Sequence, residues 1–246
     1  NELEIYKFLI ELKKKAQQHN GNVLLILGNH ELMNIKHDFR YVSNTSRVKC
    51  LTTSSSHNED NYNFKSSHTQ CSNDRKKLFD INSLLLRSMS KNMYGILKIG
   101  PYLFCHGGLE YNLAKKYKFD ISWINNLLKC FLNNKIQTNP KLMKAFNEIY
   151  DDSGGILWFR GLARNESEHC YTNKHTFKKL NATHMIVGHT PQSNGITKQC
   201  DYEGIIAIDV GLSDAFGKSP YAEYLVIHNN NFLIKQAPIS DKCYTT

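Results

Sequence analysis

Apolar residues predict alternating helices and strands along this chain. Over 2–19 they recur every three or four positions, which is the spacing of a helix with one apolar face; they are Ile5, Phe8, Leu9, Leu12 and Ala16. Asn20-Gly21 then supplies a helix stop. Further helices are predicted at 31–35 and 77–90, over most of 109–151, where Asn139-Pro140 opens the last one, and near 173–181.

Short apolar runs bounded by turn residues predict the strands. These runs lie at 22–27, 94–99, 102–105, 184–188, 195–199, 204–210, 220–228 and 231–235. Gly100-Pro101 joins two of them and indicates a hairpin. Helices mixed with strands, and a strand-rich C-terminal part, predict an α/β fold in which a double β-sheet sandwich is flanked by helices. We expect a single domain over 1–246.

Residues 43–76 interrupt this pattern. Ser, Asn, Thr, His and charged residues dominate there, with Ser54-Ser55-Ser56 in the middle. Because such a segment has little apolar surface to bury, it is predicted to be a flexible, low-complexity surface insert. Its histidines, His57 and His68, are interpreted as solvated loop residues rather than metal ligands.

Size and charge narrow the function classes. The 246 residues suffice for a substantial core, and the net charge of +9 comes mostly from lysine. Basic runs such as Lys13-Lys14-Lys15 are usually solvated faces, although they also attract anionic substrates, including phosphorylated ones. No base-stacking aromatic motif interleaves them, so nucleic acid is not an expected partner. No apolar run approaches the ~20 residues of a membrane span.

The seven cysteines include no CxxC pair. Cys105 and Cys130 lie in core-like settings and are predicted to be free thiols. Free thiols favour a reducing, intracellular compartment.

Three predicted strands are followed by a motif that contains histidine. The motifs are Gly28-Asn29-His30-Glu31, His106-Gly107-Gly108 and Gly188-His189-Thr190. In open α/β sheets, ligands and metals bind at the carboxyl edge of the strands. Imidazole nitrogen and amide oxygen both ligate ions such as Mn, Fe and Zn. Each residue alone has a structural explanation, but together Asn29, His106 and His189 predict a partial metal shell.

Three further residues are candidates near such a metal. His30 follows Asn29 directly, so it suits a general acid that protonates a leaving oxygen without binding the metal. Arg160 stands in an apolar run closed by glycine; its guanidinium suits a phosphate, and a surface or ion-pair arginine is the alternative. Asp209 either accepts a hydrogen bond from a metal-bound histidine or caps a turn.

The three motifs, in this order, resemble those of the calcineurin-like metallophosphoesterases, and more narrowly of the phosphoprotein phosphatases. Three segments are most similar to the Shewanella-like protein phosphatases: Leu157-Trp158-Phe159-Arg160-Gly161, Val187-Gly188-His189-Thr190-Pro191-Gln192 and Ile208-Asp209-Val210-Gly211-Leu212-Ser213. The resemblance covers most of the chain except 43–76. It implies a metallophosphoesterase-type double β-sheet and two divalent ions, with Mn expected first and Fe or Zn as alternatives.

The resemblance also implies a role for each site residue. Asn29 and His106 would bind the second metal and His189 the first, His30 would donate a proton to the leaving group, and Arg160 would hold the phosphate. The implied enzyme is a metal-dependent phosphoprotein phosphatase, which hydrolyses phosphate monoesters on protein side chains with metal-activated water. Phosphorylated proteins are then its expected partners.

Two earlier motifs of the family have no counterpart in the sequence. They read Gly-Asp-x-His-Gly and Gly-Asp-x-x-Asp-Arg-Gly, and no Gly-Asp dipeptide occurs here. Asp74-Arg75 lacks the glycines and does not replace them. We therefore expect a fragment that lacks the first strands of the sheet. Two alternative functions remain: a nucleotide-directed metallophosphoesterase, and a non-catalytic phosphatase-like binding module if the natural protein lacks both motifs.

Overall fold

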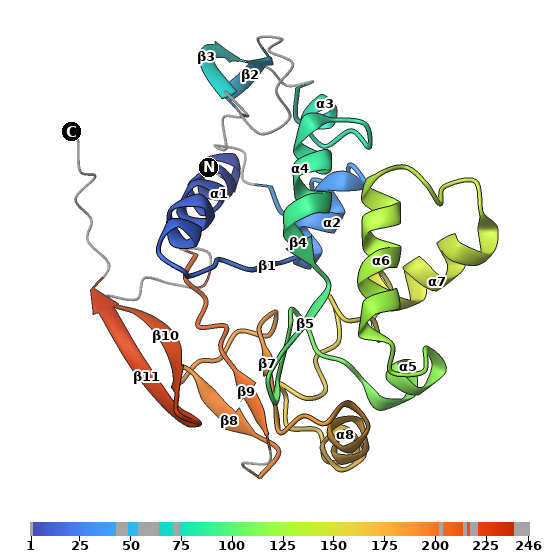
Figure 1. The fold of residues 1–246 in the computed structure, drawn as a ribbon, viewed down its shortest axis with the longest axis vertical. Coiled ribbons are helices and arrows are strands. Elements are labelled where there is room, and N and C mark those ends of the chain that lie inside the picture. The colour runs from blue at the N-terminus through green and yellow to red at the C-terminus, as the bar shows by residue number, and fades with distance from the viewer. Residues whose placement is uncertain are drawn as a thin grey trace. The chain divides into compact units, whose positions relative to one another are not determined.

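The computed structural model describes residues 2–42, 49–53, 64–70, 74–201, 204–213, 216 and 221–238 (Figure 1). The chain divides into two compact units. The first comprises Asn1–Leu25, His30–Met93 and Leu132–Asn134, and the second comprises Ile26–Asn29, Tyr94–Phe131 and Lys135–Thr246. The single catalytic domain stays a prediction. Two short strands, β1 (Leu25–Ile26) and β4 (Met93–Tyr94), lie where the chain passes from one unit to the other.

Helices make up most of the first unit. They are α1 (Glu2–Gln18), α2 (Asn29–Ile35, from His30 onward), α3 (Asp74–Leu78) and α4 (Leu84–Asn92). The Tyr6 hydroxyl lies 3.0 Å from Ser88 Oγ, and Lys13 Nζ donates to Asn92 Oδ1 at 3.1 Å. These side-chain bonds join α1 to α4.

The first helix forms as predicted, but most of its apolar stripe is not buried. Ile5 and Phe8 are 58% and 60% exposed, and Leu12 is also exposed. Tyr6 is the buried residue of α1. The apolar spacing therefore predicted the helix correctly, whereas burial is decided by what packs on it.

The predicted insert at 43–76 is only partly described. Residues 43–48, 54–63 and 71–73 lie outside the described residues, His57 among them. Between them, β2 (Lys49–Thr53) pairs antiparallel with β3 (Phe64–Gln70). The polar composition did not predict this hairpin.

Arg75, near the end of the predicted insert, is part of a packed interior. The residue is buried; its Nε donates to Asn34 Oδ1 at 2.9 Å, and its Nη2 pairs with Glu2 Oε1 at 2.6 Å. The guanidinium also lies over the rings of Phe39 and Phe79. Burial, the largest single effect, raises the pKa of Glu2, but the hydrogen bond and charge of Arg75, together with a backbone hydrogen bond and the charge of the N-terminus, outweigh it and leave the pKa lowered. Arg75 therefore supports the first unit structurally.

A five-stranded sheet of order β5-β6-β7-β9-β8 is the centre of the second unit. Its strands are β5 (Ile96–Ile99), β6 (Tyr102–Cys105), β7 (His184–Val187), β8 (Thr197–Gln199) and β9 (Ile205–Ala207). The strands β6, β7 and β9 run parallel, and β5 and β8 are antiparallel edges. The parallel strands are mostly apolar, as strands covered on both faces must be.

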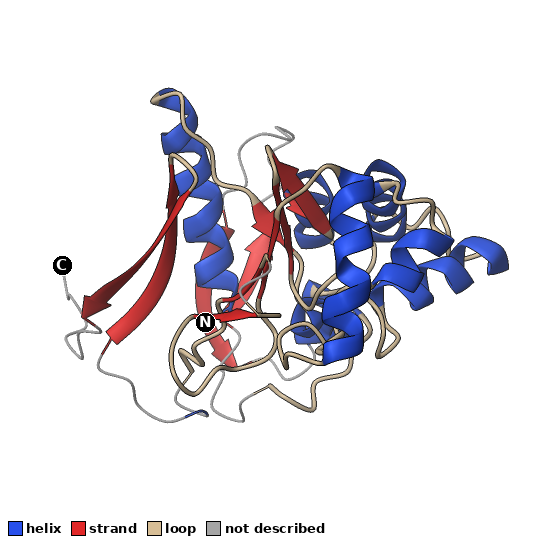
Figure 2. Ribbon diagram, turned by 90° about the horizontal axis from the view of Figure 1, so that it is seen from below, coloured by secondary structure: helices blue, strands red, loops and turns tan. Residues whose placement is uncertain are grey.

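A second, two-stranded sheet covers one face of this sheet. It pairs β10 (Tyr221–His228) with β11 (Asn231–Pro238). Leu225, Ile227 and Phe232 of the hairpin pack against a cluster formed by Ile186, Ile196 and Ile206. On the other side of the five-stranded sheet lie α5 (Tyr111–Lys116), α6 (Ile121–Leu132), α7 (Pro140–Tyr150) and α8 (Ser167–Leu180) (Figures 1 and 2). This arrangement confirms the predicted α/β fold with two sheets and flanking helices.

The cysteines follow the prediction in part. Cys105 and Cys130 are free, as predicted. Cys170 and Cys200 form a disulfide that joins α8 to the turn after β8, which the sequence did not reveal. The intracellular compartment stays a prediction.

Candidate metal centre

Parallel pairing of β6 and β7 brings two of the three motifs together. Cys105 is in register with Val187, so the residues that follow each strand emerge at the same carboxyl edge. The Gly188 amide continues the pairing by donating to the His106 carbonyl at 2.8 Å. The imidazole rings of His106 and His189 consequently lie 5.0 Å apart between centroids, inclined at 54°.

Asn29 joins the histidines at this edge. It is buried, and its Oδ1 lies 2.8 Å from Nε2 of His106. Nitrogen and oxygen ligands bind a Zn-like ion at about 2.1 Å, so two ligand atoms at a tetrahedral angle on one ion are about 3.4 Å apart. The two atoms are hydrogen-bonded to each other in this structure, and a small outward shift would give them the spacing of two ligands of a single ion.

His189 is held in a backbone conformation that non-glycine residues seldom adopt. Its φ is +64°, in the left-handed region, and the residue is buried. Nη1 of Arg160 donates to its carbonyl at 2.7 Å, and the Trp158 ring meets its imidazole edge-on at 5.7 Å. Such conformations persist where the surroundings enforce them, and they cluster at functional sites.

Gly107 allows the segment that carries Arg160 to pack beside His106. The amides of Gly107 and Gly108 donate to the Ile156 carbonyl at 2.7 and 3.3 Å. A Cβ at Gly107 would lie 2.9 Å from the Phe159 carbonyl oxygen, closer than real Cβ atoms come. The glycine is therefore a requirement of close backbone approach.

Arg160 lies at the centre through its contacts with the third motif. Besides the His189 carbonyl, Nη1 reaches Thr190 Oγ1 at 3.4 Å. The guanidinium carries five N–H donors in a planar fork, a geometry that suits a phosphate at the same edge. The sequence placed Arg160 near a phosphate; the structure adds its bond to the His189 backbone.

Asp209 caps a turn, which was one of its two predicted roles. Its Oδ1 accepts from the Gly211 amide at 3.0 Å, and its carbonyl accepts from the Gln192 amide at 2.8 Å. These bonds fix the chain after β9 against the loop that follows His189.

His30 belongs to the first unit and lies at the start of α2. It is exposed, its carbonyl accepts from Asn34 Nδ2 at 2.9 Å, and its ring stacks on Tyr41 at 5.4 Å with 15° between the planes. Asn29, His106, Arg160 and His189 belong to the second unit. His30 is linked to them by its place next to Asn29 in the sequence.

The ligand set fits a borderline divalent ion. No group of three or more His, Cys, Asp or Glu side chains suited to a metal gathers within the described part of the chain. Two imidazoles and one amide oxygen do meet at the sheet edge, and these atoms suit Mn, Fe or Zn. They amount to a partial shell, because a site of this kind takes three or more protein ligands per ion and the three residues would be divided between two ions.

The neighbouring Cys105 adds no ligand or nucleophile. It is fully buried, and burial raises the pKa of its thiol to about 12. Since the thiolate is the reactive form, Cys105 is inert at neutral pH.

The comparison with known protein families agrees with the three motifs. Residues 1–193 match the family model of calcineurin-like phosphoesterases. The chain belongs to this family. The resemblance drawn from the three motifs is confirmed, and family members bind two divalent metals.

Individual relatives are similar over most of this chain. The Shewanella-like protein phosphatase 1 of Plasmodium berghei is 30% identical over 234 residues, which cover 92% of this chain and 58% of that protein. An uncharacterized protein of Schizosaccharomyces pombe is 30% identical over 216 residues, which cover 87% of this chain and 58% of that protein. This chain therefore spans less than two thirds of the length of either relative.

A solved structure shows the same fold. The cold-active protein-tyrosine phosphatase of a psychrophilic Shewanella species superimposes with a TM-score of 0.70 at 21% identity, covering 96% of this chain and 64% of that one.

Among the helices of the described residues, none combines the length and the apolar character of a membrane span.

Sequence reasoning missed several supports of the centre. The edge contact of Trp158 with His189 and the bond from Arg160 to a backbone carbonyl depend on tertiary placement. The backbone that packs against Gly107, from Ile156 and Phe159, is likewise identified only by the tertiary structure.

Proposed function

We propose that this protein is a metal-dependent phosphoprotein phosphatase, which hydrolyses phosphate monoesters on protein side chains. One observation carries the proposal: Asn29, His106 and His189 meet at the carboxyl edge of the sheet, with Arg160 bonded to the backbone of His189. Relatives named protein phosphatases support the reaction class and the protein substrate.

Each residue has a distinct task in this proposal. Asn29 and His106 hold one ion, and His189 holds the other. Bound ions of this kind lower the pKa of water and polarise a phosphate. Arg160 binds two phosphate oxygens and stabilises the charge that develops on them. His30 donates a proton to the side-chain oxygen that leaves.

His106→Ala tests the metal and the reaction together. Metal content is measured on the full-length protein, along with turnover of a phosphopeptide and of a dinucleoside polyphosphate. We expect the variant to lose metal and to lose phosphopeptide turnover by more than ~100-fold, since even outer partners of a metal ligand cost 10–100-fold. The matched control is His228→Ala, which removes an exposed histidine at the hairpin turn. Preferential turnover of the dinucleotide would favour the nucleotide-directed enzyme, and metal-loaded protein without turnover would favour the binding module.

His30→Asn tests the proton donor separately. We expect turnover of a serine phosphopeptide to fall by about 100-fold or more, the usual contribution of a general acid, with metal content unchanged. A substrate whose leaving group is a nitrophenol needs little protonation and should be affected much less. Equal losses on both substrates would contradict the assigned role.

A further inference from the structure

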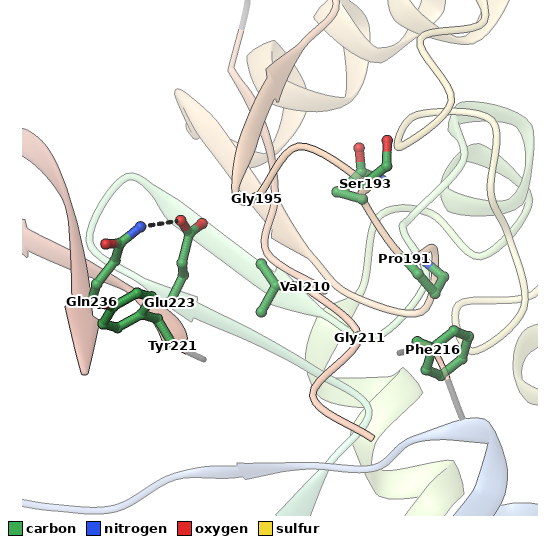
Figure 3. Close-up of a pocket in the computed structure, with 10 residues that line it drawn as sticks. Pro191, Ser193, Gly195, Val210, Gly211, Phe216, Tyr221, Glu223 and Gln236 are labelled. Carbon is green, nitrogen blue, oxygen red and sulfur yellow. Dashed lines mark hydrogen bonds between the residues drawn. The ribbon is translucent and has the colours of Figure 1, made fainter. Parts of the chain in front are cut away.

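A pocket lies next to the candidate metal centre, within the second unit. It has a volume of about 450 Å³ and lies between the loop that follows Thr190 and the β10–β11 hairpin (Figure 3). None of the residues given a role in catalysis lines it.

One end of the pocket is close to the metal centre and combines apolar side chains with the polar Gln192 and Ser193. Pro191 lines this end and is two residues after His189, so their Cα atoms are within roughly 8 Å of each other. Phe216 and Gly211 lie beside Pro191, and Val210 lies further along the pocket (Figure 3).

The other end carries a carboxylate. Glu223 Oε1 accepts from Gln236 Nε2 at 2.8 Å, and Oε2 accepts from the Ile196 amide at 2.7 Å. These two bonds keep the pKa of Glu223 below its usual value, so the group is charged at neutral pH. Tyr221 precedes Glu223 by two residues on β10, so both side chains are on the same face of the hairpin, and both line the pocket. Among the described residues that line the pocket, Glu223 is the one with a charge.

The loop is shaped around this carboxylate. Gly195 has a φ of +78°, and a Cβ at this position would overlap the Glu223 carboxylate. Only glycine therefore lets the backbone pass so close to Glu223. The carboxylate is thus fixed by two hydrogen bonds and a close-fitting loop, as a binding group should be.

We propose that this pocket binds an arginine side chain of the substrate, a few residues from the phosphorylated one; this rests on the proposed phosphoprotein phosphatase function. An arginine has an apolar stem for the end at Pro191 and a cation for the end at Glu223. Its guanidinium can also stack on the Tyr221 ring while it bonds the carboxylate. An acidic side chain would be repelled by Glu223, whose charge is not offset by a cation among the described residues of the lining.

Paired phosphopeptides test the proposal on the full-length protein. One series carries a single arginine at each of the three positions on either side of the phosphorylated residue, and the other carries citrulline, which has the same shape without the charge. At one position we expect kcat/KM for the arginine peptide to exceed that for the citrulline peptide about fivefold or more. A ratio of this size is what one partly exposed ion pair with an aromatic neighbour contributes.

Glu223→Gln should bring this ratio to about one. Both peptides are assayed on the same preparation, so the ratio does not depend on how much of the variant is folded. The matched control is Glu168→Gln, which removes an exposed carboxylate from α8 and should leave the ratio at the wild-type value.

The outcomes separate the two proposals. Hydrolysis of all peptides without an arginine preference would overturn the pocket assignment and leave the phosphatase proposal standing. A preference that survives Glu223→Gln would also overturn the pocket assignment. Failure to hydrolyse any phosphopeptide would overturn both.

Discussion

At the scale of single residues, a few side chains of the candidate centre each have more than one role. His189 presents an imidazole from a left-handed backbone, and Arg160 holds that backbone through the carbonyl. A strained residue of this kind costs about 1–3 kcal/mol, which the surrounding contacts must offset. In the proposed function, Arg160 therefore links phosphate binding to the position of a metal ligand.

Arg160→Ala should weaken phosphate binding and metal retention together. We expect the inhibition constant of inorganic phosphate to rise by roughly 10- to 100-fold, which corresponds to a charged hydrogen bond of about 1.5–3 kcal/mol. The metal content should also fall, because the His189 carbonyl loses its donor. Phosphate inhibition and metal analysis measure the two effects. Arg164→Ala, an exposed arginine in the same loop, is the control, and an unchanged inhibition constant in Arg160→Ala would contradict the assignment.

At the scale of elements, the second unit depends on how the β10–β11 hairpin and α8 are attached to the sheet. The start of β7 contacts the hairpin through His184, whose ring lies 4.4 Å from that of Phe232. On the other side, the Cys170–Cys200 disulfide joins α8 to the chain between β8 and β9. Each attachment can be tested by itself.

His184 should make the stability of the protein depend on pH. Burial lowers the pKa of its imidazole below 6.5, and the nearby charge of Lys198 lowers it further. The unfolded chain therefore takes up the proton first as the pH falls. The contribution of His184 to the free energy of unfolding is complete above about pH 6.5. It declines as the pH falls towards the lowered pKa of His184 in the folded protein, and it stays constant below that pKa.

We expect His184→Gln to make the fall in melting temperature between pH 7.5 and 5 shallower than in the unmodified protein. Melting curves across this range measure the effect. His19→Gln removes an exposed histidine of α1 and serves as the control. Identical slopes for the unmodified protein and His184→Gln would contradict the account.

Cys170→Ser should destabilise the protein by removing the link between α8 and the turn after β8. The two cysteines are 30 residues apart, and closing a loop of this length contributes about 3–4 kcal/mol in the chain-entropy model. Urea unfolding with and without dithiothreitol measures the difference. Reductant should destabilise the unmodified protein and Cys130→Ser alike, and it should have no effect on Cys170→Ser.

At the scale of the whole molecule, metal binding and folding are linked. An ion that binds the folded chain and not the unfolded one stabilises it by mass action. The ligands Asn29, His106 and His189 come from three separate parts of the sequence, so they meet only after folding. If the candidate centre binds metal as proposed, it therefore adds stability to the folded chain.

Manganese at about 100 times its dissociation constant should stabilise the full-length protein by about 2.7 kcal/mol. A rise in melting temperature with added metal, reversed by a chelator, measures this. His228→Ala should keep the rise and His106→Ala should lose most of it. A rise of the same size in His106→Ala would place the bound metal elsewhere.

Much of the fold was predictable because its signals are local. Apolar periodicity located α1, and Asn139-Pro140 located the start of α7, where Asn139 Oδ1 accepts from the Lys141 and Leu142 amides. Turn residues bounded β6 and β7 to within a residue or two. Local signals did not reveal the hairpin of β2 and β3, because both strands are polar and each is defined by its pairing with the other.

The candidate residues of the centre were predictable for a related reason. His106 and His189 each follow an apolar strand, and parallel strands share a carboxyl edge. The supports of the centre were not predictable, because Trp158 and the Ile156 carbonyl reach it through contacts between segments far apart in the sequence.

The sequence by itself determined the order of most elements, apart from the β2–β3 hairpin, and also the α/β class, the family and the candidate ligands, since apolar spacing and short motifs are properties of neighbouring residues. Only the tertiary structure decided that Asn29 meets His106, that Arg160 holds the His189 carbonyl, that Asp209 caps a turn, and that Cys170 bonds Cys200. The pocket at Glu223 also belongs to that second group, because a loop after β7 and a hairpin near the end of the chain form it together. The physical reason is the same in each case: packing, which no local pattern encodes, decides which distant side chains become neighbours.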